Sequence, residues 1–466
     1  MSVLPGQQTA RVVAMQKITW RLVPFLMLCY FVSYIDRINI GFAALQMRGE
    51  LNLSATAYGF GGSLFLVSYC LFSVPSNAGL QRFGTRQWIA LLMIVWGVLS
   101  MAMATVSGPI SFYVLRFLVG AAEAGFFPGI VFYITRWFPA SYRARIASIF
   151  LLAVPLSSFV GSTLSGALME IQAGGLSGWQ WMFLIEGAPA VLLGFAFLWL
   201  MADAPEAVRW LTDVQKKALV DELESEEHSK PATGAMPLMK VIFDRQVMAL
   251  SLTYSGVLSV GVCLSLWQPQ LIKSFGLTNF QTGLLSSVPF GVATIVMVLW
   301  GRSSDRSDER KWHTAIPLLL SAFAMLATFV VSSLMATIAL LSLMLVGSYS
   351  SKGPFWAMVT QRLSARNVAI ALAVVSGTGS MASALTTYLF GIIRELTGSY
   401  ELALLPLVGL TLSGSAVLFL VGQKPAIEPA IPSGHSDETR PIPTHPPAPS
   451  VRATSNNSAV GVGDRD

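Results

Sequence analysis

Four ionisable side chains lie inside two long apolar stretches of the sequence. Asp36 and Arg37 interrupt the first stretch, and Arg116 and Glu123 interrupt the fourth. A charged side chain at the centre of a membrane-spanning helix costs on the order of 2.5 to 3.5 kcal/mol, so such residues persist only where they face one another or a water-filled cavity. The pattern therefore predicts a polar pathway, and we expect it to move a small anion with the help of protons.

The composition indicates that these four residues lie in membrane-spanning helices. Hydrophobic residues make up 54% of the 466-residue chain and charged residues 12%, with a mean hydropathy of +0.62. A soluble protein has about 25% charged residues. Apolar stretches of about 20 residues recur, and each is long enough to cross a hydrocarbon core of about 30 Å. We therefore expect an all-α membrane protein with about twelve spanning helices.

The chain is expected to divide into two repeated halves. Each half has a basic loop after its second span, at 82–86 and at 301–306. Repeated halves with a binding site between them near the midplane are the physical basis of alternating access. We expect an N-terminal six-helix bundle at 1–202, a cytoplasmic linker at 203–245, a C-terminal six-helix bundle at 246–421 and a disordered cytoplasmic tail at 422–466.

The expected spans and the linker follow from the same pattern. The acidic stretch 221–227 of the linker can form an exposed amphipathic helix, although a solvated linker is the simpler expectation. The first apolar stretch continues past Asp36 without a cleavage site, so it is a true span rather than a secretory signal. The spans are expected at 19–45, 56–79, 87–107, 110–136, 143–170, 179–202, 246–273, 281–301, 312–333, 336–361, 366–393 and 400–421.

Basic residues predict the orientation of the chain. An even number of spans places both termini on one side, and most loop arginines fall on that side, which identifies it as the cytoplasm. We expect a monomer in the lipid bilayer of a bacterial inner membrane. Because membrane orientation explains the basic loops, no nucleic-acid partner is expected. The arginines and lysine on that side are Arg82, Arg86, Arg136, Arg143, Arg145, Arg302, Arg306, Arg310, Lys311, Arg362 and Arg366, with mainly Arg48, Lys273 and Arg394 opposite.

The residue types suggest how an anion and a proton could be bound together. The planar guanidinium of Arg37 can make two charge-assisted hydrogen bonds to a carboxylate. Arg116 and Glu123 are two helical turns apart and share one face. Two carboxylates balance two arginines, so an arriving anion adds a negative charge that a proton on a carboxyl removes. A static ion pair that merely fixes helix packing is the alternative. The four histidines, His228, His313, His435 and His445, fall in loops or the tail.

Other candidates concern specificity. Lys352 lies in the middle of the tenth span, and helical spacing places it in one stripe with Tyr349 and Trp356. Lys352 can offer a second positive site suited to a dianion or to a hydroxylated or aromatic acid, while a lysine that snorkels or pairs with a polar neighbour is an equally good account. Tyr34 and Tyr69 are possible hydroxyl donors, although packing is the commoner role of such aromatics.

Charged residues near the ends of the spans are expected to act in gating or in structure rather than in binding substrate. Asp305 can offer its carboxylate to a helix N-terminus or to an arginine across the seam between the halves, so we expect Arg302, Asp305 and Arg306 to act as a gate. Glu186 is expected to have a hydrated structural role near the outer interface.

Several motifs resemble the major facilitator superfamily, and specifically its anion:cation symporter branch, which includes permeases for tartrate, phthalate and hexonates. The segment 34–40 is similar to the first-helix signature of that branch. The segment 116–129, with Arg116, Glu123 and Gly125, is similar to its fourth-helix signature. Further similar segments are Pro75-Ser76-Asn77, Trp137-Phe138-Pro139, Gly178-Trp179-Gln180-Trp181 with Glu186-Gly187, Ser304-Asp305-Arg306 and Pro354-Phe355-Trp356.

The resemblance implies roles for the charged residues. Asp36 and Glu123 are implied to carry protons, and Arg37 and Arg116 to bear on the substrate or on the adjacent carboxylates. The chain departs from the family at two positions. Gln81 replaces the usual acidic residue of the first-half loop, and Ser376 replaces an asparagine that usually touches substrate, so Ser376 is a candidate specificity residue.

Taken together, the sequence predicts a secondary active transporter that takes up a small organic carboxylate with protons by alternating access. The sequence shows no phosphate loop, metal-ligand cluster or activated nucleophile, so neither enzymatic activity nor a cofactor is expected. Two alternatives remain open. One is an exporter or exchanger of organic anions, although the Gly-Pro motif of drug exporters is not reproduced in the fifth span. The other is a transporter-like sensor, although neither the linker nor the tail resembles an output domain.

Overall fold

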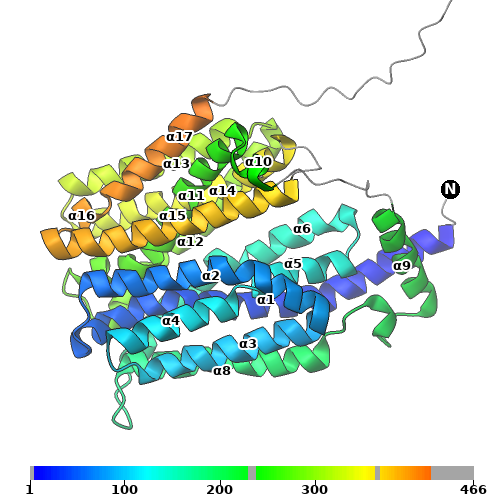
Figure 1. Ribbon diagram of the computed structural model, residues 1–466, viewed down its shortest axis with the longest axis horizontal. Helices are drawn as coiled ribbons and strands as arrows, with labels where there is room; N and C mark the ends of the chain where they lie inside the picture. The colour runs from blue at the N-terminus through cyan, green and yellow to red at the C-terminus, as the bar shows by residue number, and fades with distance from the viewer. Residues whose placement is uncertain (1–4, 229–237, 363–367, 421–466) are drawn as a thin grey trace, which may run out of the picture. The chain divides into compact units, whose positions relative to one another are not determined.

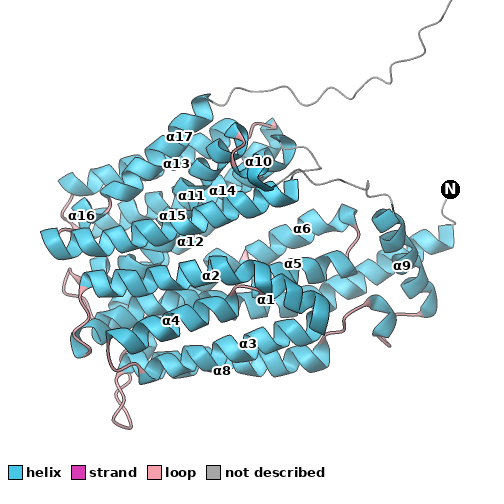
Figure 2. Cartoon of the chain, in the orientation of Figure 1, coloured by secondary structure: helices cyan, strands magenta, loops and turns pink. Residues whose placement is uncertain are grey.

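The computed structural model describes residues 5–228, 238–362 and 368–420, and the regular elements in these ranges are helices (Figure 2). Eleven of these helices are long and apolar enough to cross a membrane. The remaining crossing of the first half is formed by two consecutive helices that are interrupted at Leu152. The prediction of an all-α membrane protein with twelve crossings is confirmed. The expected tail lies outside the described residues.

The helix bounds agree with the expected spans to within a few residues, except that the first helix begins well before the expected position 19. Figure 1 shows the two halves as two layers of helices. The N-terminal half contains α1 (Pro5–Glu50), α2 (Ala55–Phe83), α3 (Thr85–Ala102), η1 (Met103–Thr105), α4 (Pro109–Glu123), α5 (Phe126–Trp137), α6 (Ala140–Leu151), α7 (Ala153–Leu168) and α8 (Gly178–Leu200). The C-terminal half contains α11 (Arg245–Lys273), α12 (Asn279–Ser307), α13 (Lys311–Ala327), η3 (Thr328–Val330), α14 (Leu334–Arg362), α15 (Val368–Thr397), α16 (Tyr400–Ala403) and α17 (Leu405–Leu420).

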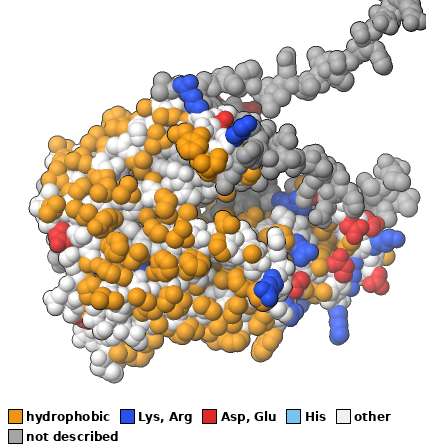
Figure 3. Space-filling view, in the orientation of Figure 1, with side chains coloured by type: hydrophobic (Ala, Val, Ile, Leu, Met, Phe, Trp, Pro, Cys, Tyr) orange, Lys and Arg blue, Asp and Glu red, His pale blue; other side chains and the backbone are white. Residues whose placement is uncertain are grey.

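Local chemistry sets where the helices begin. Ser54, Asp244 and Thr278 each accept a hydrogen bond from a backbone N–H in the first turn of the helix that follows, which satisfies donors that the helix itself leaves unpaired. Large apolar side chains such as Leu192 and Trp199 are exposed on the outer faces, as a lipid-facing surface requires. Figure 3 shows this apolar surface, with the Lys, Arg, Asp and Glu side chains gathered mainly towards one end.

The segment between the halves contains η2 (Pro205–Ala207), α9 (Asp213–His228) and α10 (Leu238–Ile242). The acidic stretch forms part of α9, as expected, but the idea of a merely solvated linker is wrong, because Leu219 is fully buried. Arg11 Nη2 forms an ion pair with Glu222 Oε1 at 2.6 Å and ties α9 to the start of α1. Partial burial raises the pKa of Glu222, while the charge of Arg11 acts in the opposite direction.

The two halves are joined at the end where α1 finishes and α2 begins, which we call the closed end. There Arg48 Nη1 donates to Gln270 Oε1 at 2.6 Å, and the backbone N–H of Phe280 donates to Glu170 Oε1 at 3.0 Å. The other end of the bundles, where α1 begins, is called the open end. Figure 3 shows a recess between the halves on that side.

Glycine allows the helices to meet closely at the closed end. A Cβ atom on Gly283 of α12 would lie 2.5 Å from the backbone oxygen of Ser162 and 2.8 Å from the Cα of Gly166, both on α7. These neighbours are backbone atoms, so they cannot move aside as a flexible side chain could. Close contact through small residues is the usual way in which membrane helices pack.

We expect Gly283→Leu to open the closed end, because the new side chain cannot fit against α7. The measurement is the labelling rate of Leu53→Cys, a buried position at this end, by a membrane-impermeant maleimide in a variant whose three native cysteines are alanine. Labelling should rise by at least about tenfold, which reports a shift in population. Gly409→Leu is the control, because a Cβ on Gly409 meets nothing within 4 Å. Equal labelling in both variants would show that this contact does not hold the end shut.

Candidate functional site

An ion pair between α1 and α4 lies at the centre of the candidate site. Arg37 Nε donates to Glu123 Oε2 at 2.7 Å, and the exposed fractions of the two side chains are 20% and 0%. Glu123 is the last residue of α4, and the chain turns at Ala124 and Gly125 before α5 begins. This interruption holds the carboxylate at a helix end within the bundle. The ion pair places a partly exposed arginine side chain against a fully buried carboxylate.

Aromatic rings surround the arginine of this pair. The guanidinium of Arg37 lies 4.8 Å from the ring centre of Tyr69, 5.1 Å from that of Tyr34 and 5.8 Å from that of Phe65. Arg116 lies 4.6 Å from the ring centre of the same Phe65. Cation–π contacts of this kind stabilise a cation without consuming its hydrogen-bond donors. One phenylalanine therefore joins the two arginines that the sequence predicts to bind an anion.

Both arginines keep donors that have no protein partner. Arg37 Nη2, Arg116 Nε and Glu123 Oε1 are buried atoms without a hydrogen bond in the described part of the chain. Buried polar atoms are nearly always paired in proteins, so unpaired ones call for an explanation such as an absent ligand. The two guanidinium donors can bind an anion, and the carboxylate oxygen of Glu123 can bind a proton.

Asp36 does not join this group, contrary to the expectation that all four charged side chains meet in one chamber. Its carboxylate accepts hydrogen bonds from Ser100 Oγ at 2.9 Å and Trp96 Nε1 at 3.2 Å, both on α3, and from Asn39 Nδ2 at 3.4 Å. The physical reason is that successive residues on a helix point about 100° apart. Asp36 therefore faces the interior of the N-terminal half when Arg37 faces Glu123.

The C-terminal half contributes a second group of side chains. Lys352 Nζ lies 4.1 Å from the ring centre of Tyr349, and the ring of Trp356 lies 4.7 Å from that of Tyr254. Tyr254 lies near Tyr34 and Tyr69 of the first half, and Tyr349 lies near Tyr34. The aromatic residues around Arg37 and those beside Lys352 therefore face one another across the seam between the halves.

One member of this group was not singled out from the sequence. Tyr254 was missed, and a tyrosine in the middle of a buried helix is the signal that could have found it. Ser376 is partly buried on α15, and the backbone oxygen of the next residue, Gly377, faces Cys70 Sγ of α2 at 3.9 Å. Ser376 thus lies close to the seam.

Glu186, which was expected to be hydrated, is only 3% exposed, so that expectation is wrong.

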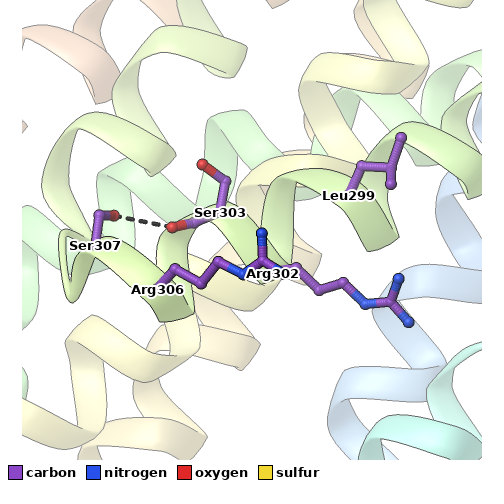
Figure 4. A pocket seen from close by; sticks show the side chains of 5 residues that line it. All are labelled: Leu299, Arg302, Ser303, Arg306 and Ser307. Atoms are coloured by element: carbon purple, nitrogen blue, oxygen red, sulfur yellow. Dashed lines mark hydrogen bonds between the residues drawn. The ribbon is translucent and has the colours of Figure 1, made fainter.

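The residues expected to form a gate lie at the end of α12. Arg302 and Arg306 line a shallow pocket together with Leu299, and Figure 4 shows both arginines extending from α12. Asp305 pairs with Arg310 of its own half at 2.7 Å. Their assignment to a gate stays a prediction.

Neighbouring acidic residues at the same end act as helix caps. Glu309 accepts hydrogen bonds from the backbone N–H groups of Trp312 and His313. Partial burial raises the pKa of Glu309, but these bonds outweigh it and lower the pKa overall. Asp203, which follows α8, accepts a hydrogen bond from the backbone N–H of Arg86 at 2.8 Å and so caps the start of α3. This acidic residue lies beside the loop between α2 and α3, where the family usually has an acidic residue and this chain has Gln81.

Comparison with known proteins agrees with this architecture. The family model of the Major Facilitator Superfamily matches residues 26–438. A protein of Agrobacterium vitis named "Putative tartrate transporter" is 44% identical over 408 residues, which cover 87% of this chain and 90% of that protein. The "Quinolone resistance transporter" of Acinetobacter baumannii is 37% identical over 404 residues, covering 85% and 93%.

The fold also matches a solved transporter. The crystal structure of a D-xylose-proton symporter superposes with a TM-score of 0.71 at 16% identity and covers 87% of this chain and 98% of that one. The family and these relatives are transporters of small molecules rather than enzymes. The chain is therefore a multi-pass membrane transport protein that belongs to the Major Facilitator Superfamily.

Proposed function

We propose that the protein takes up a small organic carboxylate together with protons, by alternating access. The observation that carries this proposal is the ion pair between Arg37 and Glu123, in which each side chain keeps one buried polar atom without a partner. A carboxylate of the substrate would complete the hydrogen bonds of the guanidinium. A proton would complete those of Glu123.

The same pair explains why proton and substrate bind together. Arg37 Nε is occupied by the carboxylate of Glu123, so an arriving anion competes with Glu123 for the same positive charge. Protonation of Glu123 removes that competition, and an anion nearby in turn favours the protonated form. Each ligand therefore increases the affinity for the other, as linkage requires.

Lys352 suggests which carboxylates are taken up. The described residues place no acidic partner beside it, and its ammonium group lies against the ring of Tyr349. An anion with two carboxylates could bind Arg37 and Arg116 through one group and Lys352 through the other. Such a substrate would link the two halves. The name of the Agrobacterium relative supports a hydroxylated diacid of the tartrate type.

The distribution of basic residues supports an orientation with both termini in the cytoplasm of a bacterial cell. Arg82, Arg86, Arg302 and Arg306 lie at the open end, where α2 and α12 finish and α3 begins. Arginine and lysine favour the cytoplasmic side. With this orientation the described conformation is closed to the outside and open to the cytoplasm, the state from which substrate is released.

Export is the alternative that a specific observation favours, since one relative carries the name of a quinolone resistance transporter. Direction is tested in proteoliposomes that contain the protein in a known orientation. We expect an inward proton gradient to drive accumulation of labelled tartrate, and unlabelled sugar acids and aromatic carboxylates to compete to different extents. Accumulation only under the reverse gradient would support export.

We expect Glu123→Gln to lower gradient-driven accumulation by more than about tenfold while counterflow exchange continues. Glutamine still accepts a hydrogen bond from Arg37 but cannot bind or release a proton. Both assays use labelled tartrate and the same preparation of proteoliposomes. Glu206→Gln, at an exposed position, is the control and should accumulate like the parent protein. Normal accumulation in Glu123→Gln would remove the coupling role from Glu123.

We expect Lys352→Gln to weaken the binding of a dicarboxylate by about tenfold, which corresponds to about 1.4 kcal/mol, because one of two charge contacts is lost. Binding of a monocarboxylate of similar size should change much less. Affinities are compared by competition against labelled substrate in counterflow. Lys240→Gln changes an exposed lysine on α10 and serves as the control. Unchanged affinity for the dicarboxylate would rule out substrate contact by Lys352.

A further inference from the structure

A second pair of buried acidic residues lies behind the substrate site, inside the N-terminal half. Asp36 of α1 and Glu186 of α8 are each 3% exposed on helices that pack against each other, and Glu186 lies within electrostatic reach of Asp36. Asn39 of α1 is close to both, because its Nδ2 donates to Asp36 at 3.4 Å and its side chain lies near Glu186. We call Asp36 and Glu186 the acidic pair.

No cation balances the acidic pair in the described helices that surround it. Helix α8 packs against α1, α3, α7 and η1. Helix α7 and η1 contain no charged residue, and Arg86 at the far end of α3 is the only charged residue of that helix. Arg37 of α1 is turned towards Glu123, and the other ionisable group that acts on Asp36 is Glu123 itself. Two ionised carboxylates would therefore be buried near each other without a cation to balance them.

The hydrogen bonds divide unequally between the two acids. Asp36 accepts from Trp96, Ser100 and Asn39, as an ionised carboxylate requires. Glu186 Oε1 accepts from Ser165 Oγ at 2.7 Å, whereas Glu186 Oε2 is buried without a partner. Hydrogen bonds donated to a carboxylate favour its charged form, and burial without them favours the neutral form. The environments thus assign different protonation states to the two residues.

We propose that the acidic pair binds one exchangeable proton in this conformation, held on Glu186 Oε2, and that Glu186 is a proton-binding residue in addition to Asp36 and Glu123. The carbonyl oxygen Oε1 then accepts from Ser165, and Asp36 stays ionised. This inference rests on the proposed proton coupling for its role in transport. The protonation state itself can be measured without transport.

The direct test is infrared difference spectroscopy of the purified full-length protein, exchanged between neutral and alkaline buffer. Exposed carboxylates are already ionised at neutral pH and do not contribute. The wild-type protein should lose a carbonyl-stretching band of a protonated carboxyl group. Glu186→Gln should lack this band, whereas Asp36→Asn and the exposed control Glu206→Gln should keep it. Absence of the band from the wild type, or its persistence in Glu186→Gln, would overturn the proposal.

Ser165→Ala provides a second test that keeps Glu186 in place. Loss of the hydrogen bond to Oε1 should move the band to higher frequency, since the carbonyl bond becomes stronger without an acceptor role. This variant guards against a folding failure of Glu186→Gln. A band at the same frequency in Ser165→Ala would show that the protonated group is not Glu186.

The transport readout is the pH profile of tartrate counterflow. Glutamine at position 186 mimics the protonated acid at every pH, so the decline of counterflow at alkaline pH should move to higher pH in Glu186→Gln. A merely structural role of Glu186 would leave the profile unchanged, and that result would overturn its part in coupling. If the wild type does not transport tartrate at all, the proposed substrate class fails while the infrared result still stands.

Discussion

The ion pair between Arg37 and Glu123 is the interaction on which the rest of the site depends. A charge in the hydrocarbon layer is tolerated only with a partner or with water, and here each charge has the other. The arrangement is not saturated, since both side chains retain a buried polar atom without a hydrogen bond. An interaction that is strong enough to hold two charges and incomplete enough to accept a ligand is what a reversible binding site needs.

Aromatic side chains make this incomplete pairing possible. Phe65 lies under both Arg37 and Arg116, and Tyr34 and Tyr69 flank the first of them. Ring faces attract cations but do not occupy N–H donors, so two guanidinium groups can stay close together and remain able to bind an anion. Acidic residues in the same places would hold the arginines more tightly and leave no unfilled donors.

The fold could be predicted from the sequence, whereas the direction of individual side chains could not. Length and hydropathy place each span because a helix must cover the thickness of the bilayer. The need of the four charged residues for partners or water follows from the high cost of charge in a membrane, but their pairing was left open. The orientation of Asp36 and the burial of Glu186 depend on how α1, α3 and α8 pack, and spacing within one helix does not determine its neighbours. Even so, two adjacent residues on a helix point in different directions, so the sequence alone could have predicted that Asp36 and Arg37 do not face the same group of residues.

That separation has a mechanical consequence. Asp36 is fixed to α3 by Trp96 and Ser100, and Arg37 is fixed to α4 by Glu123, so one helix carries two anchors that point in different directions. If α1 rotated so as to release one anchor, the other anchor would be strained or released as well, because a helix is stiff over one turn. An element with two discrete positions, biased from both sides, is the physical basis on which two sites can be coupled. Under the proposed mechanism helix α1 would meet this requirement, because Arg37 on one side would contact the anion while Asp36 on the other side belongs to the acidic pair.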